Sequence, residues 1–177
     1  MSIKEALKMV REDENALLYV EEQTEEICMA AVKQKGLALE YVKEQTPEIC
    51  LEAVKQNGMA LRYIKKQTPE ICMAAVKQHN AVFVLKFVKE QTSEICIEAV
   101  KQNGYALQYV KEQTEEICMA AVKQKGLALE YVKEQTPEIC LEAVNQTPNA
   151  IMYVKDKSML SNTPKPNQNK SEVMSIF

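Results

Sequence analysis

Apolar and polar positions alternate along the chain in a pattern that repeats every 22 residues. In one copy the apolar residues of the first half lie three or four positions apart, and they are Ile49, Cys50, Ala53 and Val54. This spacing places them on one face of an α-helix. A second apolar group with helical spacing follows within residues 59–66. Each copy is therefore predicted to be a pair of short helices.

Residues typical of helix ends occupy the same places in each copy. Thr46 precedes Pro47, and threonine before a first-turn proline is a typical helix N-cap, because its hydroxyl accepts a free backbone N–H. Asn57-Gly58 follows the first helix, and we expect this glycine to end it in a left-handed backbone conformation. The second helix is expected over Met59–Lys66. Helices this short are unstable alone, so stacking on neighbours must stabilise them, as in solenoids.

These repeats predict an all-α fold, an α-solenoid of about seven helix-turn-helix units over residues 1–156. The units start near residues 1, 23, 45, 67, 91, 113 and 135. The first unit is expected to be a degenerate cap, because Glu5 stands where later copies have a core isoleucine. Residues 157–177 are rich in Ser, Asn, Pro and Lys and are predicted to form a flexible polar tail.

Longer periods are superimposed on the 22-residue unit. Residues 22–54 are identical to residues 112–144, which indicates recent duplication of a four-unit block. Met29-Ala30 and Leu51-Glu52 alternate at one place of the repeat. The structural module is therefore predicted to span two units.

Composition and charge narrow the function classes. The formal net charge of −3 gives no strong overall attraction to nucleic acid or acidic lipid. No apolar run approaches the roughly 20 residues of a membrane span, and the first residues lack the apolar block of a signal peptide. We therefore expect a cytoplasmic protein without a membrane partner.

One cysteine recurs in each of six units, at Cys28, Cys50, Cys72, Cys96, Cys118 and Cys140. Equivalent helices of a stack lie about 8–10 Å apart, whereas a disulfide requires Cα atoms within about 7 Å. The spacing also differs from that of zinc-binding cysteines. We predict six reduced, buried thiols. Because no paired carboxylates, metal cluster or activated nucleophile stands at a unique place, the chain is predicted to be no enzyme and to hold no cofactor or metal.

Aromatic and basic residues also recur. The aromatic row is Tyr19, Tyr41, Tyr63, Phe87, Tyr109, Tyr131 and Tyr153. We expect core packing with the hydroxyl at the surface; a stacking platform for bases is the alternative. One lysine row is Lys33, Lys55, Lys77, Lys101 and Lys123, and the other is Lys43, Lys65, Lys89, Lys111, Lys133 and Lys155. RNA or nucleotide binding along these rows is a second hypothesis, although neighbouring glutamates favour a solvated surface.

The string Glu-Ala-Val-Lys-Gln-Asn-Gly-x-Ala-Leu-x-Tyr, present at residues 52–63 and in part at 102–109 and 124–131, resembles a known repeat family. It is similar to the short helical repeats of unknown function found in large DNA viruses, phages and bacteria. The resemblance covers about residues 1–156 and implies no activity. It places the protein in the cytoplasm of a bacterium or of a virus-infected host cell.

Candidate binding residues are found where the copying is imperfect. His79-Asn80-Ala81-Val82 replaces the usual two-residue turn, and we weigh a recognition loop against a tolerated insertion that buries Phe83. Two positions of the second helix also vary between units, one at its edge and one facing outward. Partial burial against the next unit is the alternative for the edge position. The candidate partner-binding residues are Leu37, Met59, Arg62, His79, Val82, Phe83, Lys86, Tyr105, Gln108 and Leu127.

The leading hypothesis is a non-enzymatic protein-binding scaffold, because the core positions barely vary, the edge positions vary, and no catalytic cluster is present. The family analogy extends it to a viral or phage inhibitor of a host defence protein such as an RNA-guided nuclease. A third hypothesis is lipid-surface binding through amphipathic helices, although the mid-unit glycines fit packed hairpins better.

Overall fold

A computed structural model describes residues 1–13, 15–78 and 81–161, and within these residues every regular element is a helix. The predicted all-α solenoid is confirmed. In chain order the elements, with 3₁₀ helices labelled η, are α1 (Ile3–Glu12), η1 (Ala16–Tyr19), α2 (Glu25–Gln34), η2 (Gly36–Tyr41), α3 (Pro47–Gln56), η3 (Gly58–Tyr63), α4 (Pro69–Val76), α5 (Ala81–Val84), η4 (Leu85–Phe87), α6 (Ser93–Gln102), η5 (Gly104–Tyr109), α7 (Glu115–Gln124), η6 (Gly126–Tyr131), α8 (Pro137–Gln146), η7 (Pro148–Tyr153) and α9 (Ser158–Ser161).

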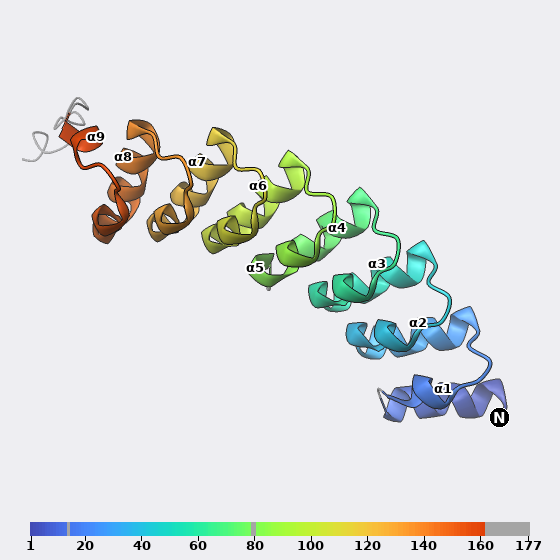
Figure 1. The fold of residues 1–177 in the computed structure, drawn as a ribbon. Coiled ribbons are helices and arrows are strands. Elements are labelled where there is room, and N and C mark those ends of the chain that lie inside the picture. The colour runs from blue at the N-terminus through green and yellow to red at the C-terminus, as the bar shows by residue number, and fades with distance from the viewer. Residues whose placement is uncertain (14, 79–80, 162–177) are drawn as a thin grey trace, which may run out of the picture.

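The units stack side by side in chain order into a curved array (Figure 1). Each long α-helix packs against the long α-helices of the units before and after it. The 3₁₀ helices pack on one another in the same order, except that α5 takes the place of η4 against η3. Between the two layers lies one continuous apolar core. Because each unit contacts only its neighbours, stability is shared between the units and the interfaces between them.

The predicted helix starts are confirmed. The Thr46 hydroxyl accepts a hydrogen bond from the Ile49 N–H at 3.3 Å, and Pro47 occupies the first turn of α3. The other long helices from α2 to α8 have the same threonine cap. In the first unit Ser2 takes the place of the threonine, and its side chain and that of Glu5 form a reciprocal capping box. The degenerate first copy therefore keeps its start signal.

The second helix of each unit differs from the prediction. In the third unit it is the 3₁₀ helix η3, and it ends at Tyr63 rather than at Lys66. Its backbone bonds join residues three apart, as in Ala60 N–H to Asn57 C=O at 2.9 Å. The apolar residues of this segment are themselves three apart, and a helix with three residues per turn aligns them.

The role predicted for the glycine is wrong. None of the four glycines, all within the described part of the chain, has a positive φ. Each instead lies against the following unit: a Cβ at Gly58 would sit 2.6 Å from the Ala75 carbonyl oxygen, and one at Gly104 would sit 2.6 Å from that of Ala121. Close packing between units therefore requires glycine here.

The fourth unit departs from the others because Val82 stands in the place of this glycine. A valine held on the regular backbone would collide with the next helix, as the distances at Gly58 show. The two extra residues give the chain another route, in which α4 ends at Val76 and a separate turn, α5, precedes η4.

The flexible tail predicted from residue 157 does not hold for its first residues. Ser158–Ser161 form the short helix α9, which packs on α8. Met159 and Leu160 are partly buried against the core and cover the end of the last unit. Residues 162–177 lie outside the described part of the chain.

Candidate partner-binding surface

The 3₁₀ geometry brings the two variable positions of each unit together. Met59 and Arg62 are three residues apart in η3, so they lie above one another on a single ridge. On an α-helix these two positions would be about 60° apart, whereas the 3₁₀ helix aligns them. We call this surface the outer ridge and define it by the equivalent pairs Leu37/Glu40, Met59/Arg62, Phe83/Lys86, Tyr105/Gln108 and Leu127/Glu130.

Nine of the ten predicted binding residues lie on the outer ridge or beside it. Phe83 is 56% exposed, so the prediction that the insertion buries it is wrong. Val82 and the remaining apolar ridge residues are half-buried, and Arg62, Lys86 and Gln108 are exposed. Partial burial of Leu37, Met59, Tyr105 and Leu127 against the next unit agrees with the alternative weighed for them. His79 lies outside the described residues.

The aromatic row runs alongside the outer ridge and contacts it. The Phe83 and Tyr109 ring centroids are 6.5 Å apart, and those of Tyr105 and Tyr131 are 6.0 Å apart in an edge-to-face arrangement. Each pair joins a ridge residue of one unit to the row residue of the next. From Tyr41 to Tyr153 the row is half-buried, between core and surface, whereas Tyr19 is 70% exposed.

Cations of the chain itself lie over some of these rings. The Arg62 guanidinium is 5.0 Å from the Tyr63 centroid and 5.6 Å from that of Phe87, so it lies between the row residues of two units. The Lys125 ammonium lies 5.1 Å from the Tyr105 centroid. Distances below about 6 Å are those of cation–π contacts. The rings of Tyr63, Phe87 and Tyr105 are therefore already in contact with cations of the chain itself.

A hollow of about 150 Å³ opens on the same surface along the second unit, and one residue of the first unit and one of the third also line it. Its lining residues are Asn15, Lys35, Leu37, Ala38, Glu40, Tyr41 and Tyr63. Burial and a hydrogen bond to the Glu40 carboxylate raise the pKa of Tyr63. Burial and the charge of Glu130 likewise raise the pKa of Tyr131. Tyr63 and Tyr131 therefore stay protonated at neutral pH.

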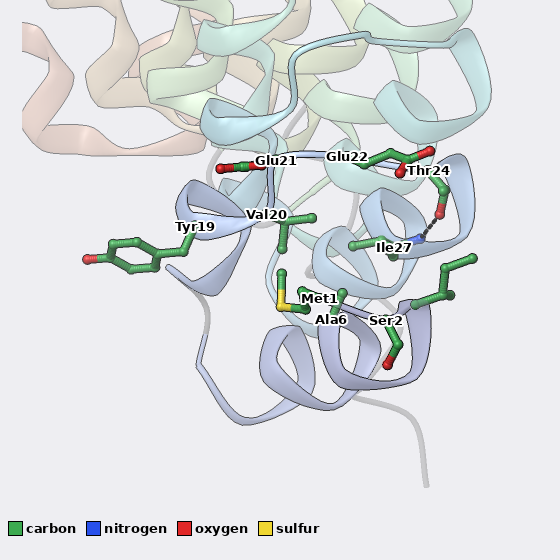
Figure 2. A pocket seen from close by; sticks show the side chains of 10 residues that line it. Met1, Ser2, Ala6, Tyr19, Val20, Glu21, Glu22, Thr24 and Ile27 are labelled. Carbon is green, nitrogen blue, oxygen red and sulfur yellow. Dashed lines mark hydrogen bonds between the residues drawn. The ribbon is translucent and has the colours of Figure 1, made fainter.

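A second hollow, of about 390 Å³, lies at the N-terminal end between the first two units (Figure 2). Met1, Ala6, Val20 and Ile27 line it, and Figure 2 shows the Tyr19 ring pointing away from them. This hollow is separate from the outer ridge.

From the second unit to the seventh, a glutamine at the start of the unit makes several hydrogen bonds, and sequence reasoning did not single it out. Gln91 Nε2 donates to the Leu85 and Tyr109 carbonyls at 3.2 and 2.9 Å. Its Oε1 accepts from the Lys111 N–H at 3.0 Å and from the Cys96 thiol at 3.7 Å. Gln23, Gln45, Gln67, Gln113 and Gln135 make corresponding bonds. The glutamine thus joins two successive units, and its presence in each of these copies was the available signal.

The lysine row that starts at Lys43 is also structural. Lys111 Nζ donates to the Lys89 carbonyl at 2.9 Å, and Lys133 Nζ donates to the Lys111 carbonyl at 2.9 Å. The other members reach back one unit in the same way. The row that starts at Lys33 lies exposed on the long α-helices. Half of the predicted basic surface is therefore already bonded to backbone carbonyls.

The cysteine row lies in the core, as predicted. All six thiols are free and buried. Each donates a long hydrogen bond to the glutamine of its own unit, at distances such as 3.5 Å for Cys140 and Gln135. Burial raises the pKa of each thiol. The thiols are thus held protonated and unreactive.

Neither metal ligands nor a membrane span is found among the described residues. In residues 1–13, 15–78 and 81–161, no three His, Cys, Asp or Glu side chains are grouped so that they could hold a metal ion. Over the same residues, the helices are too short or too polar to cross a bilayer.

The stacked two-helix units and their shared ridge define an α-helical solenoid of tandem repeats. The chain belongs to the family described as "Domain of unknown function (DUF4116)", which matches residues 46–91, 92–136 and 114–159. Each match is two units long, in agreement with the predicted two-unit module. The resemblance to a repeat family of unknown function is thereby confirmed. Neither the curated proteins nor the solved structures contain a match to this chain.

Proposed function

We propose that the chain is a non-enzymatic scaffold that binds another protein through the outer ridge. The observation that carries this proposal is Phe83, a phenylalanine that is 56% exposed in the middle of the array. It lies in line with half-buried Met59 and Tyr105 of the neighbouring units. An apolar strip of this kind, continued over several repeats, fits an extended or helical segment of a partner.

The narrower form of the proposal is an inhibitor that covers a host defence protein such as an RNA-guided nuclease. It depends on the viral and phage analogy and stays a prediction. RNA binding would have to use the exposed lysines of the long α-helices, because the other row is bonded to carbonyls. Lipid-surface binding would require the apolar faces that the stack buries.

Selection from a random peptide display library on the full chain tests the proposal without knowledge of the partner. We expect enriched peptides whose binding is lost when Met59, Phe83 and Tyr105 are changed together to serine. The matched control changes three half-buried residues of the long helices, Met29, Met73 and Met119, to serine. Peptides that bind the ridge variant as well as the parent chain would refute the proposal.

A further inference from the structure

Arg62 shows where a positive charge fits on the outer ridge. Its guanidinium lies between the rings of Tyr63 and Phe87, which belong to successive units, at 5.0 and 5.6 Å from their centroids. Arg62 is itself exposed, so this position faces the solvent. Two row residues and the ridge position between them therefore form a seat for a cation.

Two other units have the same ridge position occupied by a carboxylate. Glu40 lies beside Tyr41 and Tyr63, and Glu130 lies beside Tyr131, with Tyr153 next in the row. At Glu40 the hollow of about 150 Å³ borders the carboxylate and both rings. These two units keep the aromatic residues of the row, but a glutamate stands at the ridge position that Arg62 occupies in the third unit.

We propose that the Glu40 and Glu130 seats each bind an arginine side chain of a protein partner. This inference rests on the proposed function, because the same ridge would carry both. A carboxylate offers the paired acceptors that suit the planar guanidinium, and the flanking rings offer faces on which it can stack. Arg62 makes the ring contacts in the chain itself.

Positive groups of the chain itself lie near the two seats. The Arg62 guanidinium is 5.0 Å from the centroid of Tyr63, which is one of the two rings of the Glu40 seat. Lys35 borders the Glu40 hollow, and its counterpart Lys125 lies over Tyr105 of the preceding unit. An arginine bound at Glu40 therefore shares the seat with the Lys35 ammonium and the Arg62 guanidinium, and changing Lys35 to glutamine is expected to strengthen binding there.

The two seats share identical residues, 35–41 in one and 125–131 in the other, but they differ in their neighbours, since Asn15 and Arg62 near the Glu40 seat correspond to Tyr105 and Met152 near the Glu130 seat. At about 8–10 Å for each unit, they lie about 30–40 Å apart along the array. The exposed Phe83 lies between them in the sequence, so a partner segment that contacts both seats would pass the apolar strip. Two weak seats at a fixed spacing select a partner with two arginines at a matching spacing.

Titration of the full chain with N-acetyl-arginine amide, followed by NMR of the tyrosine ring protons, tests the inference. N-acetyl-citrulline amide, which has nearly the same shape but no charge, is the control ligand. We expect saturable shifts for Tyr41, Tyr63, Tyr131 and Tyr153 with arginine only. Changing Glu40 and Glu130 together to glutamine should weaken the apparent affinity about two- to fivefold, whereas the same change at exposed Glu44 and Glu134 should leave it unaltered.

A gain-of-binding variant completes the test. Arg62→Glu removes the internal guanidinium, so Tyr63 and Phe87 should form a third seat and the Phe87 ring protons should begin to shift. Equal shifts with citrulline, unchanged affinity in the Glu40/Glu130 variant, or no response of Phe87 in Arg62→Glu would each overturn the inference. Ridge-dependent display peptides without arginine would overturn it and leave the proposed function intact. Arginine binding at the seats without any ridge-dependent peptide would overturn the proposed function and leave the arginine sites intact.

Discussion

Replacing Gln91 with leucine should remove the side-chain hydrogen bonds by which Gln91 joins the fourth and fifth units. Leucine has a similar volume but cannot donate to the Leu85 and Tyr109 carbonyls or accept from the Lys111 N–H, which Gln91 reaches at 2.9–3.2 Å. The bonds to the Leu85 and Tyr109 carbonyls are partly buried, so water replaces the amide there only in part, whereas the bond from the Lys111 N–H is exposed. The change therefore leaves backbone groups without their partner.

The size of the effect follows from these bonds. A neutral hydrogen bond contributes about 1 kcal/mol net, and three of them with good geometry give about 3 kcal/mol. The long bond from the Cys96 thiol, at 3.7 Å, adds little. With a urea dependence of about 2 kcal/mol per molar, the unfolding midpoint should fall by about 1.5 M.

Urea unfolding followed by circular dichroism measures the loss, and amide hydrogen exchange locates it. The Lys111 amide should lose protection, whereas the Lys155 amide, which is bonded to Gln135 at 2.9 Å, should keep more of it. Gln102→Leu is the matched control, since Gln102 donates only to the exposed Glu98 carboxylate among the bonds described. A midpoint for Gln91→Leu equal to that of this control would refute the reasoning.

Three further changes test other parts of the structure. Gly104→Ala should destabilise the chain by about 1–3 kcal/mol, because its Cβ would meet the Ala121 carbonyl, whereas Pro148→Ala in the last unit should cost less in the same urea experiment. Thr114→Ala should cost about 1 kcal/mol through loss of the α7 cap, again by urea unfolding; no loss would contradict the capping role. The six thiols should react with a maleimide only after unfolding. Because folding raises the pKa of the thiols, the stability that they contribute is complete below the ordinary thiol pKa and falls as the pH rises through the raised values. A melting temperature that increases with pH across this alkaline range would contradict the expected direction.

The long α-helices could be predicted because their signals are local. Thr46, Pro47 and the spacing of Ile49, Cys50 and Ala53 lie within one turn or two of each other, so the sequence contains both the start and the buried face. The interaction that fixes each cap needs no knowledge of other units. The same holds for the first unit, where Ser2 and Glu5 supply the cap.

The remaining features depend on contacts between units. Gly58 resembles a helix stop in the sequence, but its role is set by the Ala75 carbonyl of the next unit. The amide of Gln91 finds its partners 6, 18 and 20 residues away. The alignment of Met59 and Arg62 depends on the 3₁₀ geometry of η3. The spacing of apolar residues in this six-residue segment does not distinguish a 3₁₀ helix from a short α-helix. For the candidate surface, sequence variation therefore indicated which positions to consider but not that they lie together on one ridge.

The bonds of Lys111 and its equivalents have a consequence for how the array changes in length. In each of them a side chain of one unit meets a backbone carbonyl of the unit before it, and backbone carbonyls are present whatever the residue. A copied unit therefore brings its own connector and finds a ready acceptor wherever it is inserted. This connection does not depend on the identity of the preceding residue, so an inserted copy can be joined to the unit before it by the same bond.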